Sequence, residues 1–393
     1  AGLITWKYGL STGVLEVDDP LSTTEVSLQK YLDLNKNEEY ANAVIGKWHL
    51  SRDANHPNDM GVDYFAGFIG GGVRSYTNWT LNINGSTTTS TDYTTSKFTD
   101  LAIDWVSQQT KPWFLWLAYN APHTPFHLPP NNLHSQSNLP SDQASIDNNP
   151  LPYYLAALEA LDTEMGRLIN TLSEEEKQNT IIIFIGDNGT PGQVAQEYNS
   201  RRVKGSIYQG GVNVPMIVSG NGVSRTNAAE NALINTTDLY ATIADIAGTG
   251  TTEIHDSKSF KRLFSAESDH RAFQYAEKDS GTDAGWTISN GSCPDETNDV
   301  TITRDEAPST SNAGSNQSIF IVYSTSHINS TRSLEYTSAL QFLDQFKLIY
   351  QFDLISIHKP RRKLIRFAVF FSLFQRTLRC VPRRTMAPFN SIH

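Results

Sequence analysis

The chain has 393 residues, with 31 Lys and Arg against 41 Asp and Glu, which gives a formal net charge of −10. Its acidic balance excludes the basic surface that nucleic-acid-binding proteins present. The length suits one large and one small globular domain. Cys293 and Cys380, the two cysteines, predict no disulfide framework. The apolar stretch at 365–374 is too short to span a bilayer. We therefore expect no nucleic-acid partner and no transmembrane segment.

The first predicted strand, residues 43–46, is apolar and leads into Lys47 and His49. If the chain stays extended, these two side chains alternate with Trp48 and point to the same face. A lysine and a histidine side by side could bind an anion. A solvated lysine and a structural histidine explain the pattern equally well.

Residues 80–95 are rich in Thr, Ser and Asn, and they predict a surface loop or hairpin. The next apolar strand, residues 113–119, opens into a proline-rich loop that holds His123 and His127. Prolines on both sides of His123 restrict its backbone, which suits an imidazole that must transfer a proton in a fixed direction. His127 is predicted to support this loop or to be an ordinary part of it.

Residues 154–172 predict the clearest helix, because apolar side chains recur there at helical spacing. The stripe consists of Leu155, Leu158, Leu161, Met165, Leu168, Ile169 and Leu172. We interpret it as core packing rather than as a cofactor site.

The strand at 181–185 has only β-branched and aromatic residues, which predicts burial on both faces of a parallel sheet. Asp187 and Asn188 follow at its carboxyl end, where parallel strands deliver functional residues. Their carboxylate and amide oxygens suit a hard cation such as Ca²⁺ or Mg²⁺. Lys204 could bind an anionic oxygen nearby. Taken alone, Asp-Asn-Gly is also common turn chemistry.

Several separated motifs together resemble those of the sulfatase family, within the alkaline-phosphatase-like superfamily. In chain order they are Ile45-Gly-Lys-Trp-His-Leu50, Ala121-Pro-His-Thr-Pro125, Gly186-Asp-Asn-Gly189 and Lys204-Gly-Ser-Ile-Tyr-Gln-Gly-Gly211. The resemblance covers about the first two thirds of the chain. It implies an α/β fold: a doubly wound mixed sheet flanked by helices, plus a small C-terminal α+β subdomain with an antiparallel sheet. Residues 318–323 and 346–350 would be strands of that smaller sheet.

The resemblance also implies roles for the candidate residues. Asp187 and Asn188 would bind Ca²⁺ or a similar divalent ion, and Lys47 and Lys204 would hold the sulfate oxygens. His123 would protonate the leaving alcohol, while His49 would sit at the nucleophile and help to break down the sulfated intermediate. The substrate would be a sulfated small molecule or glycan. The location would be periplasmic, secreted or lysosome-like.

One departure from the family pattern concerns the nucleophile. Sulfatases use a formylglycine made from the Cys or Ser of a Cys/Ser-x-Pro-x-Arg motif, which should lie just before Ala1. A strand carrying two aspartates is also absent. We therefore expect the chain to be an inactive fragment of a sulfatase. The alternative is a noncatalytic homologue. Cys380-Val-Pro-Arg-Arg384 spells the motif, but only a circular permutation would make it the nucleophile.

We predict three regions: a catalytic domain over 1–262, a small antiparallel subdomain with a polar insertion over 263–353, and a tail over 354–393. The tail has nine basic residues and no acidic residue. That reversal of charge indicates a shifted reading frame or a join between two sequences. The functional alternative is a basic patch that binds a membrane surface.

Two other functions are compatible with these residues. The same superfamily includes phosphomonoester and phosphonate-monoester hydrolases, which would act on a different ester. A noncatalytic binding module for sulfated glycans would keep the anion pocket without hydrolysis. Arg201 and Arg202 could add local positive charge to such a pocket in an otherwise acidic protein.

Overall fold

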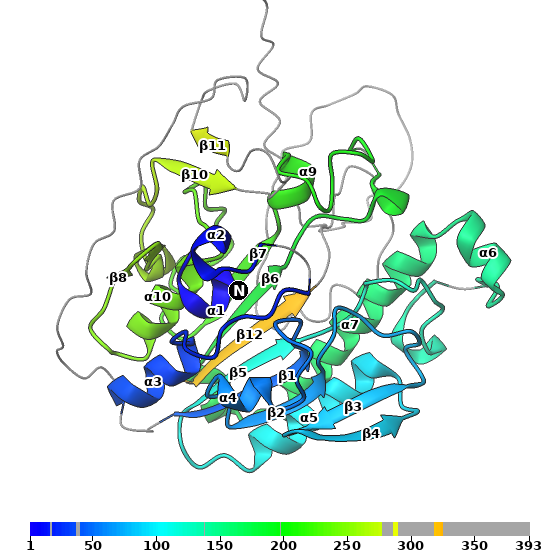
Figure 1. Ribbon diagram of the computed structural model, residues 1–393, viewed down its shortest axis with the longest axis horizontal. Helices are drawn as coiled ribbons and strands as arrows, with labels where there is room; N and C mark the ends of the chain where they lie inside the picture. The colour runs from blue at the N-terminus through cyan, green and yellow to red at the C-terminus, as the bar shows by residue number, and fades with distance from the viewer. Residues whose placement is uncertain are drawn as a thin grey trace, which may run out of the picture.

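The computed structural model describes residues 1–15, 18–36, 40–136, 138–196, 198–276, 286–289 and 318–324. Strands and helices alternate along most of these residues, as an α/β architecture requires (Figure 1). In the part of the chain so described, no helix has both the length and the apolar character needed to cross a bilayer.

An eight-stranded sheet forms the centre of the molecule, in the order β4-β3-β2-β1-β5-β12-β6-β7. Its strands are β1 (Ala41–Lys47), β2 (Tyr64–Phe68), β3 (Trp79–Ile83), β4 (Ser86–Ser90), β5 (Trp113–Ala118), β6 (Thr180–Gly186), β7 (Met216–Gly220) and β12 (Ser318–Ser324). The five strands β2, β1, β5, β12 and β6 pair in parallel. The strands β3, β4 and β7 pair antiparallel at the two sides. The predicted mixed sheet is therefore confirmed.

Helices cover both faces of the sheet, which explains why its central strands are apolar throughout. Ile181, Ile183 and Ile185 of β6 belong to one buried cluster, while Ile182 belongs to the other. The first cluster includes residues of α3 (Leu28–Lys36) and α10 (Asp238–Ile246). The second includes residues of α5 (Thr94–Ser107) and α7 (Leu151–Thr171). Figure 1 shows α3 and α10 together on one side and α7 on the other.

The long helix α7 begins three residues before the predicted start and ends one residue before the predicted end. Five residues of the predicted stripe are buried in the core, namely Leu161, Met165, Leu168, Ile169 and Leu172. Leu155 and Leu158, at the start of the stripe, are only half-buried. Pro152 lies in the first turn of the helix, where a missing N–H costs no hydrogen bond.

The remaining elements are short. They are α1 (Gly2–Thr5), α2 (Gly9–Thr12), α4 (His56–Asp59), α6 (Gln143–Asn148), α8 (Glu174–Gln178), α9 (Gln209–Val212), η1 (Asn131–Leu133), η2 (Gly192–Val194), η3 (Lys261–Phe264), β8 (Glu253–Ile254), β9 (Ser257–Lys258), β10 (Phe273–Ala276) and β11 (Trp286–Ser289). The predicted insertion at 80–95 forms the β3–β4 hairpin, which extends the sheet beyond β2.

The position of β12 corrects one prediction. We expected residues 318–323 in a small antiparallel C-terminal sheet, but they lie in the central sheet and pair in parallel with β5 and β6. A strand whose centre is apolar, as residues 319–322 are, is best placed where both of its edges are paired, and the position between β5 and β6 offers this.

Antiparallel pairing does occur between β10 and β11, in the region of the predicted subdomain. The predicted strand at 346–350, the tail over 354–393, Cys293 and Cys380 all lie outside the described residues. The boundaries at 262 and 353 stay predictions.

Candidate functional site

Three parallel strands end in one row at the carboxyl edge of the sheet. Gly46 of β1 pairs with Ala118 of β5, and β12 links Ala118 to Ile185 of β6 through Tyr323. The segments that follow these strands therefore leave the sheet at the same edge. This register brings together the residues that the sequence placed after three separate strands.

The segment after β1 turns sharply instead of staying extended. Gly46 has φ 119, and a Cβ there would lie 1.9 Å from the carbonyl oxygen of Ala118. His49 has φ 58, in the left-handed region. The premise that Lys47 and His49 alternate along an extended chain is therefore wrong, although both lie at the edge of the sheet. Trp48 Nε1, between them, donates to His56 Nδ1 over 3.0 Å, which ties the turn to the core.

The loop after β5 is held by backbone hydrogen bonds. His123 N donates to the Asn120 carbonyl over 2.8 Å. The Tyr76 hydroxyl donates to the carbonyls of His123, over 2.7 Å, and Asn120, over 3.1 Å. The His123 Nδ1 donates to the Thr124 carbonyl over 2.8 Å. Nε2 is therefore the nitrogen of the neutral ring that can accept a proton.

His127 supports this loop from behind. Its ring stacks on Tyr76, with centroids 3.8 Å apart. Its Nδ1 lies 3.1 Å from the Pro125 carbonyl, and its Nε2 lies 3.0 Å from the Tyr93 hydroxyl. Both ring nitrogens are engaged, and burial lowers the pKa of His127 to about 4. These contacts make His127 a supporting residue of the loop, one of the two roles considered for it.

A glycine-rich loop after β2, residues 70–72, lies against both His49 and His123. The sequence analysis did not identify this loop. A Cβ on Gly71 would lie 2.6 Å from His49 Nε2, and a Cβ on Gly72 would lie 3.4 Å from His123. The backbone of this loop thus packs against both rings. The signal was present as three consecutive glycines, residues 70–72, directly after a strand.

Asp187 and Lys204 come from segments that bind each other closely. Gly189 N donates to the Gly211 carbonyl over 2.9 Å, and Lys204 N donates to the Thr190 carbonyl over 3.0 Å. A Cβ on Gly189 would lie 1.8 Å from the carbonyl oxygen of Gly210, so only glycine permits this approach. The sequence motifs at 186–189 and 204–211 are therefore two sides of one contact.

The charges of these residues act on one another. Burial raises the pKa of Asp187 to about 6, although Lys47 and Lys204 oppose this rise. Burial lowers the pKa of Lys47, which Asp187 raises and Lys204 lowers. Burial, then Lys204 and more weakly Lys47, lower the pKa of His123 to about 4, against a hydrogen bond to Thr124. Lys204 and Lys47 therefore both act on a neutral His123, and two cations beside it favour an anion.

The donor set at Asp187 fits part of the shell of a hard cation. The Asp187 Oδ1 is buried and has no hydrogen-bond partner among the described residues. Asn188 Nδ2 is turned toward the Gly189 carbonyl at 3.2 Å, so the amide oxygen is the donor left for a cation. The described ranges contain no group of three His, Cys, Asp or Glu that could hold a metal. Ca²⁺ takes about six to eight oxygens, so these two residues would supply only a share.

The structure adds one residue, Asp18, that the sequence did not suggest. Its Oδ1 lies 2.9 Å from His49 Nε2, and its Oδ2 lies 3.6 Å from the guanidinium of Arg52. Burial and then Lys47 lower the pKa of His49, while the hydrogen bond and charge of Asp18 raise it. Asp18 is 31 residues from His49 in the chain, so neither spacing nor periodicity could have indicated this contact.

The two additional arginines lie on the surface. Arg201 and Arg202 are both exposed, and the Arg202 guanidinium lies 4.4 Å from the centre of the Tyr208 ring. Whether they attract a charged substrate stays a prediction.

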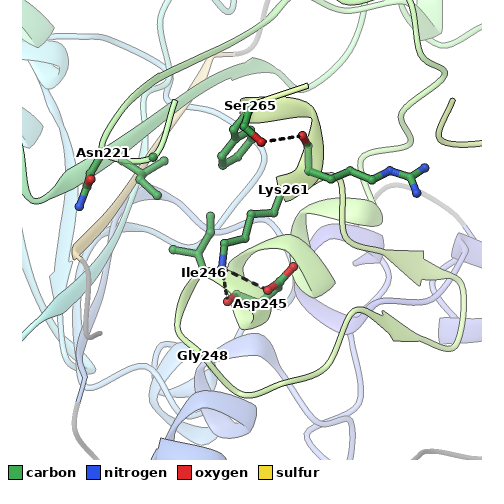
Figure 2. A pocket seen from close by; sticks show the side chains of 10 residues that line it. Asn221, Asp245, Ile246, Gly248, Lys261 and Ser265 are labelled. Atoms are coloured by element: carbon green, nitrogen blue, oxygen red, sulfur yellow. Dashed lines mark hydrogen bonds and ion pairs between the residues drawn. The ribbon is translucent and has the colours of Figure 1, made fainter. Parts of the chain in front are cut away.

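A cavity of about 410 Å³ lies elsewhere, at the start of β6 (Figure 2). The side chain of Lys261 extends into it, and its Nζ donates to the Asp245 carbonyl over 2.8 Å and to the carboxylate over 3.2 Å. The ammonium group is thus already neutralised. Since Ile181 marks the amino end of β6, this cavity is separate from the candidate site.

The chain is similar in sequence to known proteins. The sequence model of the Sulfatase family matches residues 3–249. An uncharacterized sulfatase of Escherichia coli K12, YdeN, is 30% identical over 272 residues, which is 61% of this chain and 46% of that protein. An arylsulfatase of the sea urchin Hemicentrotus pulcherrimus is 27% identical over 277 residues, 62% of this chain and 48% of that protein.

The fold also matches solved structures. The crystal structure of Ps i-CgsB in complex with k-i-k-neocarrahexaose covers 74% of this chain, and the match spans 70% of that chain. The TM-score is 0.62 and the sequence identity is 25%. The chain spans about half the length of the curated relatives it matches.

Proposed function

Because the chain belongs to the sulfatase family over residues 3–249, we propose that the complete protein hydrolyses a sulfate monoester. The observation that supports the proposal is that Lys47 and Lys204 lie close enough to both Asp187 and His123 to shift their pKa values, at the edge where β1, β5 and β6 end. A sulfate ester needs its oxygens neutralised and its leaving oxygen protonated, and this arrangement offers both.

Each residue has a distinct task in this proposal. Lys47 and Lys204 bind the sulfate oxygens as point charges. Asp187 and Asn188 hold a divalent cation, Ca²⁺ or Mg²⁺, which when bound polarises the sulfate oxygens. The buried Asp187 Oδ1, which has no partner among the described residues, supports this assignment.

His123 transfers a proton through Nε2, because Nδ1 is occupied by the Thr124 carbonyl. With a pKa of about 4 in the free site, His123 is neutral at pH 7. An anion bound between the lysines offsets the positive charges that lower this pKa, so substrate binding itself favours the protonated acid.

In this proposal the nucleophile is a formylglycine beside His49, and residues 1–46 of the sequence contain no Cys/Ser-x-Pro-x-Arg motif from which it could be made. A formylglycine there would supply the attacking oxygen, and His49 would act on the sulfated enzyme. The present chain is then expected to bind sulfate without hydrolysing esters.

The substrate class we favour is a sulfated glycan, in a compartment outside the cytoplasm. One similar solved structure is described in complex with a neocarrahexaose. A small aryl ester is the other candidate.

The experiment is a titration of the chain with inorganic sulfate in the presence of Ca²⁺. We expect saturable binding that Lys204→Ala weakens by roughly ten- to a hundredfold, the loss of a charge-assisted contact. Lys97→Ala is the control, since Lys97 pairs with Asp92 on the surface. The absence of binding to the unaltered chain would overturn the anion site.

The reaction itself is tested on the complete protein with paired aryl sulfate and aryl phosphate esters. Faster hydrolysis of the sulfate ester supports the proposal. A preference for phosphate or phosphonate esters would favour the other hydrolases of the superfamily. Glycan binding without any hydrolysis would indicate a noncatalytic module.

A further inference from the structure

The contact between Asp18 and His49 joins two residues whose backbones are both in the left-handed region. Asp18 has φ 73 and His49 has φ 58. Such conformations cost free energy for residues with a side chain, and they persist only where the surrounding structure maintains them. Here the two residues meet directly, with 2.9 Å between His49 Nε2 and Asp18 Oδ1.

The contact determines which nitrogen of His49 carries the proton. An ionised carboxylate can only accept a hydrogen bond, so Nε2 must donate. In the neutral ring, Nδ1 then has the free lone pair. Gly71 packs against the same ring, since a Cβ on it would lie 2.6 Å from His49 Nε2.

Charged groups face His49 from several elements. Burial lowers its pKa, and Lys47 at the end of β1 adds to this effect. Asp18 raises the pKa through its hydrogen bond and charge. On the loop after β5, His123 also interacts electrostatically with His49. Arg52 contacts the second oxygen of Asp18. Asp18 is thus the group that counteracts the cations around His49.

We propose that Asp18 is a positioning residue that fixes His49 as the Nε2-protonated tautomer and directs Nδ1 to act as the base of the site. This inference rests on the proposed function for the role of the base, but the contact itself can be tested without activity. An Arg52 guanidinium nitrogen lies 3.6 Å from the second oxygen of the carboxylate, and Gly71 lacks the Cβ that would clash with the ring.

The test is a pH titration of the whole chain labelled with ¹⁵N and ¹³C at histidine, followed by NMR. Loss of a signal in His49→Gln assigns His49. In the unaltered chain we expect a single tautomer with Nε2 protonated. Asp18→Asn keeps an acceptor oxygen but removes the charge, so the titration of His49 should move to lower pH with the tautomer retained. Asp18→Ala should move the titration similarly and release the tautomer.

Asp19→Asn is the matched control, because the Asp19 carboxylate accepts from Leu15 N rather than from His49. It should leave the His49 titration unchanged, and unchanged signals from the buried His56 and His270 would show that each variant is folded. The proposal is overturned if Asp18→Asn and Asp18→Ala leave His49 unaffected, or if Asp19→Asn has the same effect. Failure of the unaltered chain to bind sulfate would instead count against the proposed function, since the coupling between Asp18 and His49 does not depend on it.

Discussion

Gly71 occupies a position where any side chain would displace His49. A Cβ there would lie 2.6 Å from His49 Nε2, well inside van der Waals contact. We predict that Gly71→Ala moves the ring and breaks its hydrogen bond to Asp18. In the complete protein this should lower kcat by about tenfold or more, because misplacing a catalytic group by about 1 Å is costly.

Gly70→Ala is the matched control in the same loop. Gly70 is exposed, and a Cβ there would meet nothing within 4 Å. We expect its kcat to stay near that of the unaltered protein. Equal losses in both variants would mean that the loop as a whole, rather than the contact with His49, matters for activity.

The pKa of His123 gives a second prediction at the scale of single residues. Burial and the two lysines lower it to about 4 in the free site. If sulfate binds between Lys47 and Lys204, the pKa should rise, and by linkage sulfate should bind more tightly as the pH falls from the bound pKa toward the free one. NMR titrations of His123 with and without sulfate measure this, and identical curves would contradict it.

At the scale of elements, a buried ionic cluster joins the start of α10 to the segment after η3. The Asp238 Oδ2 accepts from Arg271 Nε over 2.8 Å and from His270 Nε2 over 3.1 Å, and Oδ1 accepts from Lys258 N over 2.9 Å. The side chain of Asp238 is fully buried. Removing its charge would take away the main counter-charge of the largely buried Arg271 and leave the weaker effect of Asp256.

We therefore predict that Asp238→Asn lowers the free energy of unfolding by about 3–5 kcal/mol, as for other broken buried pairs. Asp92→Asn, which loses only a surface pair with Lys97, should cost less than about 1 kcal/mol. Urea denaturation at pH 7 compares them. A similarly small loss of unfolding free energy in Asp238→Asn would show that the hydrogen bonds of Asp238 do not persist in solution.

The same cluster predicts a dependence on pH. Burial alone would raise the pKa of Asp238, but hydrogen bonds from Arg271 and His270 outweigh it and lower the pKa. A depressed carboxyl pKa contributes stability that is complete above the unfolded pKa and is lost as the pH falls through the folded one. The unaltered chain should lose stability more steeply than Asp238→Asn on acidification below the ordinary pKa of aspartate.

At the scale of the whole molecule, β12 decides whether the sheet is continuous. It fills the position between β5 and β6, where Ile321 pairs with Trp116 on one side and Ile183 on the other. Without it, two apolar strands would expose unpaired backbone groups. A strand that joins its sheet from so far along the chain must also close a long loop during folding.

Ile321→Pro tests this arrangement. Proline removes the N–H of residue 321 and is excluded from central strands, so we predict a loss of about 3 kcal/mol or more in the free energy of unfolding. Ile321→Val is the control, since it keeps the backbone N–H and the β-branched side chain, and its loss should be much smaller. Equal urea midpoints for the proline variant and the unaltered chain would show that β12 does not pair centrally in solution.

The sequence predicted much of the candidate site because its residues follow recognisable strands. Lys47, His123 and Asp187 each come after an apolar run, and the carboxyl ends of parallel strands necessarily share an edge. Asp18 and Gly71 were missed since each acts through a contact with a distant residue. The sharp turn at His49 was missed because a left-handed backbone is usually predicted from a glycine, and this position is a histidine.

By itself, then, the amino-acid sequence determined which segments are buried strands and which polar residues end them, since side-chain periodicity follows from local backbone geometry. Only the tertiary structure decided which strands pair and which side chains are in contact. It placed β12 in the central sheet and Asp18 beside His49. The physical reason is that local pattern sets whether a residue is buried, whereas its neighbours depend on how distant segments pack and pair their backbone groups.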